Sequence, residues 1–158
     1  MKGTMRVLSS AVLLVLSAST SAAVPFEGKF SANGKDAKLA FLMARKGDPF
    51  SGKPVTVLIF SEKDASKDKR PDFAAQMGDF GDALVIRLSG DGKAWNVIGS
   101  ELTHSALKHS GVSASGMIEV KDVSIANGEI SGRLLTAPKA DIFGEPVAID
   151  LKFHVRQP

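Results

Sequence analysis

The C-terminal segment of the chain alternates strictly between apolar and polar residues. From Val147 to Val155, valine, isoleucine, leucine, phenylalanine and valine are separated by alanine, aspartate, lysine and histidine. Period-two alternation places one set of side chains on a buried face and the other in solvent, whereas helical spacing would scatter the apolar residues. The pattern predicts a half-buried β-strand.

Two further apolar runs, Ile118–Ile125 and Glu129–Leu135, flank Asn127-Gly128. This dipeptide favours a two-residue hairpin turn, because both central residues of a type I′ turn need positive φ. The phase of the apolar residues changes at Lys121-Asp122, which predicts a β-bulge or a strand that crosses between sheets. Gly132, inside the second run, predicts a close approach by another part of the backbone.

A second hairpin is predicted from Asp82–Leu88 and Trp95–Glu101, joined by Gly90-Asp91-Gly92. Apolar residues occupy both faces of Leu84–Ile86, as they do in strands that are covered on two sides. We therefore expect this segment to be a central strand.

The remaining segments complete an all-β pattern. We expect a first strand at Phe26–Ser31, followed by a turn at Asn33-Gly34. A strand pair is expected at Ala37–Arg45 and Val55–Ser61, joined by the loop Gly47–Pro54. A short helix is expected at Pro71–Gly78 and a polar connection at Ser105–Ser115. The chain then has about eight strands. Short strands separated by turns at this spacing favour an antiparallel β-sandwich or a small β-barrel.

The first 23 residues follow a different pattern. Lys2 and Arg6 precede the apolar segment Val7–Ser17, and Ser21 and Ala23 stand at the two key positions of an A-x-A-like cleavage site. The apolar segment is about 11 residues long, whereas a membrane span needs roughly 20. Residues 1–23 are therefore predicted to be a cleaved secretory signal peptide, and residues 24–158 a single all-β domain. The expected location is periplasmic or secreted.

Composition narrows the classes of partner. Because Lys2 and Arg6, but none of the 17 acidic residues, lie in the predicted signal, residues 24–158 carry 18 basic and 17 acidic side chains. This balance lacks the clustered basic excess of a nucleic-acid-binding protein. No second long apolar run follows, so we expect no integral membrane segment in the mature chain. The chain has no cysteine, which excludes thiol catalysis, zinc-thiolate sites and iron–sulfur clusters. No cofactor is predicted.

Three histidines are the obvious candidates for chemistry. His104 and His109 lie five residues apart in a stretch without a clear strand pattern, where two imidazoles can ligate Zn or Cu with His154 or a carboxylate. Five residues is not the spacing that puts two histidines on one helix face, and no HxH or HExxH motif accompanies them. His104 and His109 are therefore weak metal-ligand candidates, and ordinary surface positions are the alternative.

Other catalytic patterns are weaker still. GxSxG is absent, and Ser113 and Ser115 in the segment Gly111–Gly116 lack the glycine spacing of a nucleophile elbow. The acid pairs Asp79 with Asp82 and Glu119 with Asp122 have the residue type used in glycoside hydrolysis, but exposed acids in turns are the commoner explanation.

Two function classes follow. The first is a non-enzymatic binding or protein-interaction module of the bacterial envelope, whose partner is an unknown protein or small molecule and whose candidate surface is the loop set Glu62–Phe73, His104–Ser115 and Pro138–Glu145. The second is a small exported metal-binding protein or hydrolase with a polar centre around His104 and His109. The lack of a catalytic motif favours the first class.

Overall fold

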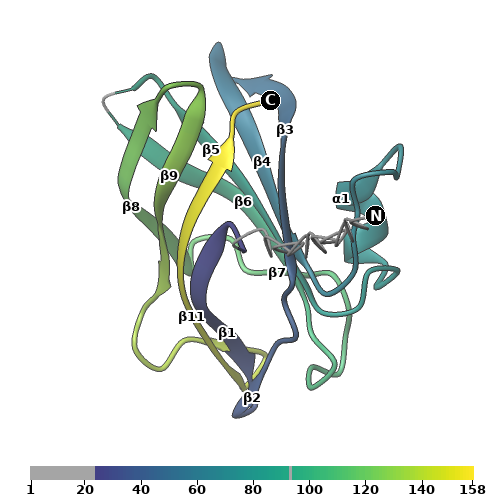
Figure 1. Ribbon diagram of the computed structural model, residues 1–158. Helices are drawn as coiled ribbons and strands as arrows, with labels where there is room; N and C mark the ends of the chain where they lie inside the picture. Colours follow the sequence, from purple (N-terminus) through teal and green to yellow (C-terminus); the bar gives the residue numbers. More distant parts are fainter. Residues whose placement is uncertain (1–23, 93) are drawn as a thin grey trace, which may run out of the picture.

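The computed structural model describes residues 24–92 and 94–158, and the predicted signal peptide, residues 1–23, lies outside them. The described residues form eleven strands and one short helix (Figure 1). The elements are β1 (Phe26–Ala32), β2 (Lys35–Asp36), β3 (Phe41–Phe50), β4 (Lys53–Ser61), α1 (Pro71–Gln76), β5 (Ala83–Gly90), β6 (Trp95–Thr103), β7 (Val112–Ser113), β8 (Ile118–Ala126), β9 (Glu129–Thr136), β10 (Asp141–Ile142) and β11 (Glu145–Arg156).

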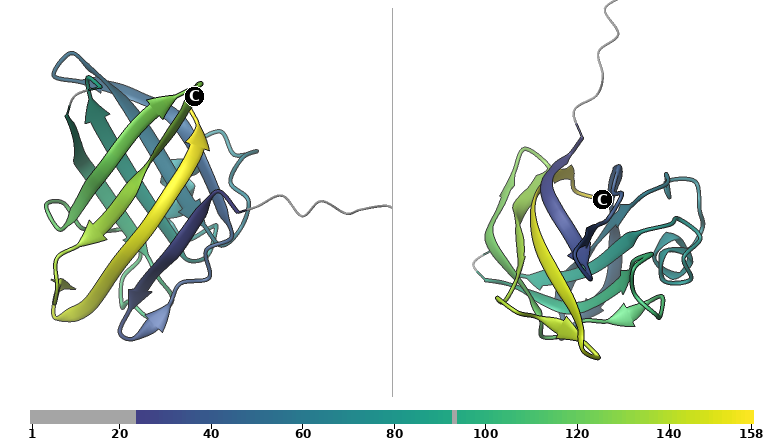
Figure 2. Two further views of the ribbon diagram at one scale, coloured as in Figure 1. Left: turned by 60° about the vertical axis from the view of Figure 1, so that its left-hand side comes forward. Right: turned by 90° about the horizontal axis from the view of Figure 1, so that it is seen from below.

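The strands form two antiparallel sheets that pack face to face as a β-sandwich (Figures 1 and 2). Sheet A has the order β2-β1-β11-β9-β8, with β10 paired to β11, and sheet B has the order β3-β4-β5-β6-β7. Three of the strands (β2, β7 and β10) have only two residues, so the predicted number of about eight matches the longer strands. The all-β prediction is confirmed, and the strands do not close into a barrel.

The core lies between the two sheets, and the predicted alternation supplies it. Along β11, the side chains of Val147, Ile149, Leu151 and Phe153 are buried, and the residues between them are exposed. They pack against apolar side chains of sheet B, among which Phe60 meets the Phe153 ring edge-on with 6.4 Å between centroids. The half-buried strand is therefore observed as predicted.

The predicted hairpin around Asn127-Gly128 is also present, as β8 and β9. Its register shifts between Lys121 and Ser124, and Asp122 has a φ of 54°, so the change of phase marks a β-bulge. At Gly132 an added Cβ would lie 2.9 Å from Cζ of Phe153 and 3.3 Å from the carbonyl oxygen of Lys121 in the neighbouring strand. The predicted close approach by backbone is therefore present, together with a closer one by a side chain.

The β3–β4 hairpin extends further than the sequence indicated. We expected a loop at Gly47–Pro54, but β3 continues to Phe50 and turns through Ser51-Gly52 into β4. Ser51 adopts a φ of 50° and Gly52 a φ of 75°, so serine occupies a position where asparagine would have given a clearer signal.

A second apolar cluster covers the outer face of sheet B. It contains Val55, Val57 and Ile59 of β4, Ala83 and Val85 of β5, and Ala75 of α1. The predicted helix is confirmed, and it lies against this face (Figure 1). The Thr103 hydroxyl donates a hydrogen bond of 3.0 Å to the Ala75 carbonyl, which ties α1 to β6. Strand β5 is thus covered on both sides, as predicted.

Among the described residues, no helix has the length and apolar character needed to cross a membrane.

Candidate functional site

A hollow of about 510 Å³ opens on the outer face of sheet B, beside α1. We call it the sheet B hollow. Its lining combines an apolar part with charged and polar groups, and consists of Arg45, Lys46, Gly47, Asp48, Pro49, Phe50, Val55, Val57, Asp72, Arg87 and Ile98. Ligand sites on proteins are usually mostly apolar with a few fixed polar groups, and this hollow has more polar and charged groups than that.

The register of sheet B brings these side chains together. Arg45 is opposite Val57 in the β3–β4 pair, and Val57 is opposite Arg87 in the β4–β5 pair, so the three side chains lie in one row across the sheet. Between β5 and β6 the register shifts: Arg87 pairs with Gly99 and the next residue with Val97. This bulge leaves Ile98 as an additional residue, and its side chain lines the hollow.

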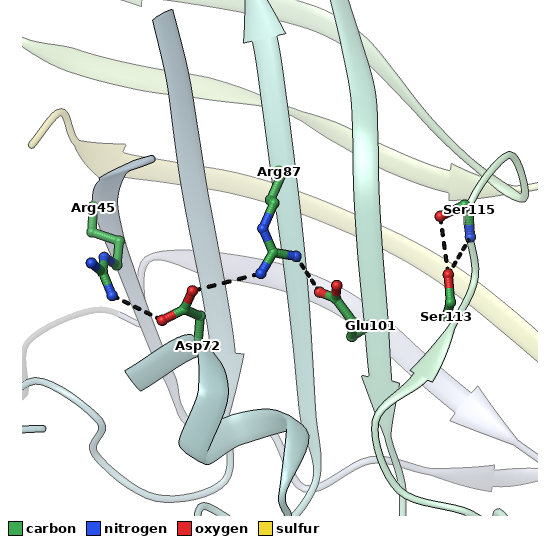
Figure 3. A network of polar contacts seen from close by, with 6 residues as sticks. All are labelled: Arg45, Asp72, Arg87, Glu101, Ser113 and Ser115. Carbon is green, nitrogen blue, oxygen red and sulfur yellow. Dashed lines mark hydrogen bonds and ion pairs between the residues drawn. The ribbon is translucent and has the colours of Figure 1, made fainter. Parts of the chain in front are cut away.

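A chain of ion pairs borders the hollow (Figure 3). Asp72, in the first turn of α1, accepts a hydrogen bond of 2.8 Å from Nη1 of Arg45, and its other oxygen lies 3.6 Å from Nη2 of Arg87. Arg87 also donates to Glu101 through Nη1. Positive and negative groups therefore alternate across β3, α1, β5 and β6. All four side chains are half-buried, which weakens the screening of their charges by solvent.

The network fixes the guanidinium groups but does not use all of their donors. A guanidinium has five N–H donors, whereas the hydrogen bonds in this network use one N–H group of Arg45 and one of Arg87. The lining includes three basic side chains (Arg45, Lys46 and Arg87) and two acidic ones (Asp48 and Asp72), and Glu101 beside it balances the third positive charge, so the unused guanidinium donors rather than a net charge favour an anion. The site is therefore suited to hold an anionic group beside an apolar one.

The structure places His104 in the core, with 3% of its surface exposed. Its Nδ1 accepts the Ala106 N–H at 3.0 Å, so the proton of a neutral ring lies on Nε2, and its ring stands edge-on to Phe30 with 5.0 Å between centroids. Within the described residues Nε2 has no hydrogen-bond partner. His104 is thus a packed core histidine, a position that the sequence pattern did not indicate.

Asp82, which is also buried, lies near His104. Its carboxylate accepts the backbone N–H groups of Lys38 at 3.0 Å and Ser105 at 2.7 Å. Burial raises the pKa of Asp82, but these two hydrogen bonds and His104 outweigh it, so the net effect is a pKa below the ordinary value. Asp82 holds together three separate segments at one end of sheet B.

His109, unlike His104, is exposed. In the part of the chain that the structure describes, no group of three or more histidine and acidic residues is arranged to hold a metal ion. His154 is on the exposed face of β11 and lies 2.6 Å from Glu129. The metal site at His104 and His109 stays a prediction, and these contacts give it no additional ligand.

The other candidates occupy structural positions. Ser113 is the last residue of the edge strand β7, and its hydroxyl group shares a hydrogen bond of 3.0 Å with that of Ser115 (Figure 3). Glu119 pairs with Lys121 on the exposed surface of β8. Of the three predicted loops, the first leads into α1 and supplies Asp72, whereas the second and third meet where the Lys108 N–H donates to Glu145 at 3.3 Å.

Little in the sequence indicated the sheet B hollow. The apolar pattern placed Arg87 on the same face as Ala83 and Val85, but nothing paired it with Asp72 or Glu101, because those contacts follow from the position of α1 on the sheet.

Comparisons with family models, curated proteins and solved structures found no match to this chain. The function therefore has to be inferred from the protein's own residues.

Proposed function

We propose that this protein is an exported, non-enzymatic binding module of the bacterial envelope, whose ligand occupies the sheet B hollow. The ligand carries an anionic group beside an apolar one. The observation behind the proposal is the juxtaposition of Arg45 and Arg87, each held by a carboxylate, with the apolar side chains of Val57 and Ile98. Fixed donors beside apolar surface bind without first having to become ordered.

The two arginines have distinct parts in this proposal. Arg87 pairs with both Asp72 and Glu101 and so keeps the network in place. Arg45 comes from the edge strand β3, and its side chain is more exposed than that of Arg87. Arg45 is therefore the group that donates to the anion of the ligand, and Lys46 adds a second positive charge to the rim.

Anilinonaphthalene sulfonate is a suitable probe, because it joins a sulfonate to aromatic rings. We expect the native protein to bind it saturably at one site in a fluorescence titration, and Arg45→Gln to weaken binding about tenfold through loss of a charge-assisted hydrogen bond. Arg133→Gln is the matched control. Arg133 also pairs with a carboxylate, that of Asp150, but it lies on the exposed face of sheet A.

Thermal unfolding curves of the three proteins show whether each is folded during the titration. If Arg45→Gln and Arg133→Gln bind the probe as tightly as the unchanged protein does, the hollow is not the site.

The proposed export has its own test: intact-mass measurement of the protein recovered from the envelope should show a chain that begins at Val24, and a retained N-terminus would contradict it.

A further inference from the structure

Four two-residue turns of this fold share one backbone conformation. Asn33-Gly34, Ser51-Gly52, Asn127-Gly128 and Phe143-Gly144 all have φ between 50° and 53° at the first residue and between 74° and 80° at the glycine. Asparagine tolerates this left-handed conformation, and a small serine occupies it in one turn. Phenylalanine is a bulky residue for which positive φ is unfavourable. Among these four turns, the β10–β11 turn is thus the one whose first residue, Phe143, is unfavourable in this conformation.

Packing of the Phe143 side chain within the described part of the fold does not offset this unfavourable backbone conformation. It is 86% exposed, the largest exposed fraction among the large hydrophobic residues that the structure describes. The preceding residue, Ile142, is buried in the core. The hairpin therefore uses Ile142 to anchor itself and presents Phe143 to solvent, as expected of a side chain whose contact lies outside the molecule.

Hydrogen bonds hold this hairpin against two neighbouring loops. The Asn33 side-chain amide donates to the Ala106 carbonyl at 2.8 Å and to Glu145 at 2.9 Å, and the Asn33 backbone N–H donates to the Pro146 carbonyl at 2.9 Å. Glu145 also accepts the Lys108 N–H. The β1–β2 turn, the 104–111 loop and the β10–β11 hairpin are thereby joined at one end of the sandwich (Figure 2). A hairpin fixed in this way loses little freedom on binding.

The tip of the hairpin has the chemistry that the sheet B hollow requires. Phe143 lies between two acidic residues, Asp141 and Glu145. The hydrogen bond from the Asn33 side chain lowers the pKa of Glu145 and so favours its anionic form. Asp141 accepts the Gly144 N–H through Oδ1 at 2.9 Å, and a carboxylate has room for further donors. The tip thus combines an aromatic ring with carboxylates on both sides.

We propose that the β10–β11 hairpin of one molecule docks into the sheet B hollow of a second copy of this chain. Phe143 fills the apolar part beside Val57 and Ile98, and the flanking carboxylates face Arg45 and Lys46 at the rim. The volume of about 510 Å³ accommodates a phenylalanine side chain. This inference rests on the proposed function, since it names an occupant for the same hollow, but the hollow can bind a ligand without it.

The two docking surfaces lie on different parts of the molecule. Phe143 is at the tip of a hairpin and does not line the hollow of its own chain. A contact between unlike surfaces is heterologous, so each added molecule again offers a free tip and a free hollow. Because one hairpin buries far less area than the roughly 1,600 Å² of a standard interface, we expect weak assembly that grows with concentration.

Sedimentation velocity from low micromolar to millimolar concentration tests the proposal. The unchanged protein should shift progressively to faster sedimentation. Phe143→Asn removes the ring and supplies a residue that this turn favours, so it should stay monomeric without loss of thermal stability. The double variant Lys46→Glu with Phe50→Ser alters two exposed rim residues, leaves the ion-pair network intact, and should also stay monomeric.

Mixing the two variants gives the decisive result. Phe143→Asn keeps an intact hollow, and the rim variant keeps an intact tip, so an equimolar mixture should form heterodimers and no larger species. Adding Asn127→Phe to the Phe143→Asn protein is the matched control, since it builds the same Phe-Gly turn in another hairpin. That protein should remain monomeric.

Three outcomes would overturn the proposal: an unchanged protein that is monomeric at all concentrations, a mixture that does not associate, or assembly restored by Asn127→Phe. The first two would leave the binding of anilinonaphthalene sulfonate by the hollow unaffected. Loss of probe binding together with persistent assembly would contradict the proposed function instead.

Discussion

The outer faces of the two sheets differ sharply although the sheets have similar sizes. The outer face of sheet A is a solvated surface of ion pairs: Arg133 lies 2.7 Å from Asp150, His154 lies 2.6 Å from Glu129, and further pairs occur on β1 and β8. The outer face of sheet B carries an apolar cluster under α1, and the ion pairs that Arg87 makes at the border of that cluster are half-buried. The outer face of sheet A is therefore stable in contact with water, whereas the outer face of sheet B is stable only where other side chains bury it.

The difference originates in the side chains of the central strands. In β11, of sheet A, buried residues alternate with exposed ones, whereas in β4, of sheet B, the seven residues Val55–Ser61 are all buried. A strand with apolar residues on both faces must be covered twice. Helix α1 covers one part of sheet B's outer face, and the hollow is where the covering ends. A surface on which partly exposed apolar side chains lie beside charged groups held in place by ion pairs is suited to binding a ligand.

The largest expected effect comes from placing a charge on each face. Ile59→Asp introduces a carboxylate into the apolar cluster on the outer face of sheet B, where Ile59 is fully buried. Burial of an unpaired charge should lower the free energy of unfolding by about 4 kcal/mol or more. Ala148→Asp makes the same addition on the exposed face of β11 and should change it by less than about 0.5 kcal/mol. Urea denaturation measures both, and equal losses would remove the distinction between the faces.

A smaller effect is expected at Asp82, the buried carboxylate at the start of β5. Asp82→Asn replaces an acceptor of two backbone N–H groups by an amide that can accept through only one atom. We expect a loss of about 2.5 kcal/mol at neutral pH, because Asp82 is buried and one of its two charge-assisted hydrogen bonds to part-buried N–H groups is lost. Asp150→Asn, on the exposed face of sheet A, is the control and should leave the urea midpoint nearly unchanged.

The pH dependence of the free energy of unfolding of Asp82→Asn, measured against that of the unchanged protein, tests the same carboxylate further. The folded-state pKa of Asp82 lies below its ordinary value of 3.8, so its stabilising effect is fully present above that value and is lost as the pH falls through the folded pKa. The stability difference between the unchanged protein and Asp82→Asn should therefore shrink on acidification below about pH 4. A difference that is constant from neutral to acid pH would mean that the charge of Asp82 is not what stabilises the fold.

The same contrast explains how much of the fold the sequence predicts. Local patterns are sufficient for the alternation at Val147–Val155, the Asn127-Gly128 turn and the phase change at Lys121-Asp122, because each depends on neighbouring residues. The β3–β4 turn was missed, because Ser51 is not a residue that identifies such a turn. Side-chain periodicity also cannot distinguish two sheets from a closed barrel, since that choice depends on which strands pair.

The candidate site depends on longer-range contacts. Asp72 meets Arg45 and Arg87 only because α1 lies across the outer face of sheet B, and no local pattern encodes that position. His104 is buried because Phe30, from the first strand, packs against it. Phe143 lies within the predicted loop Pro138–Glu145, but no local pattern indicates that a phenylalanine there has the same positive φ as Asn33, Ser51 and Asn127.

The smallest expected effect separates the ion pairs of the two faces. Arg87→Met leaves the half-buried Glu101 without the arginine that pairs with it and should lower the free energy of unfolding by about 2 kcal/mol. Arg133→Met breaks an ion pair between two exposed side chains and should give no measurable change, because solvent screens such pairs. The unfolding of both variants by urea in low and high salt provides the measurement. Since salt screens exposed charges more than half-buried ones, the loss in Arg87→Met should persist in high salt. If it disappears there, the network on sheet B is as solvated as the outer face of sheet A, and its arginines are not held in place for a ligand.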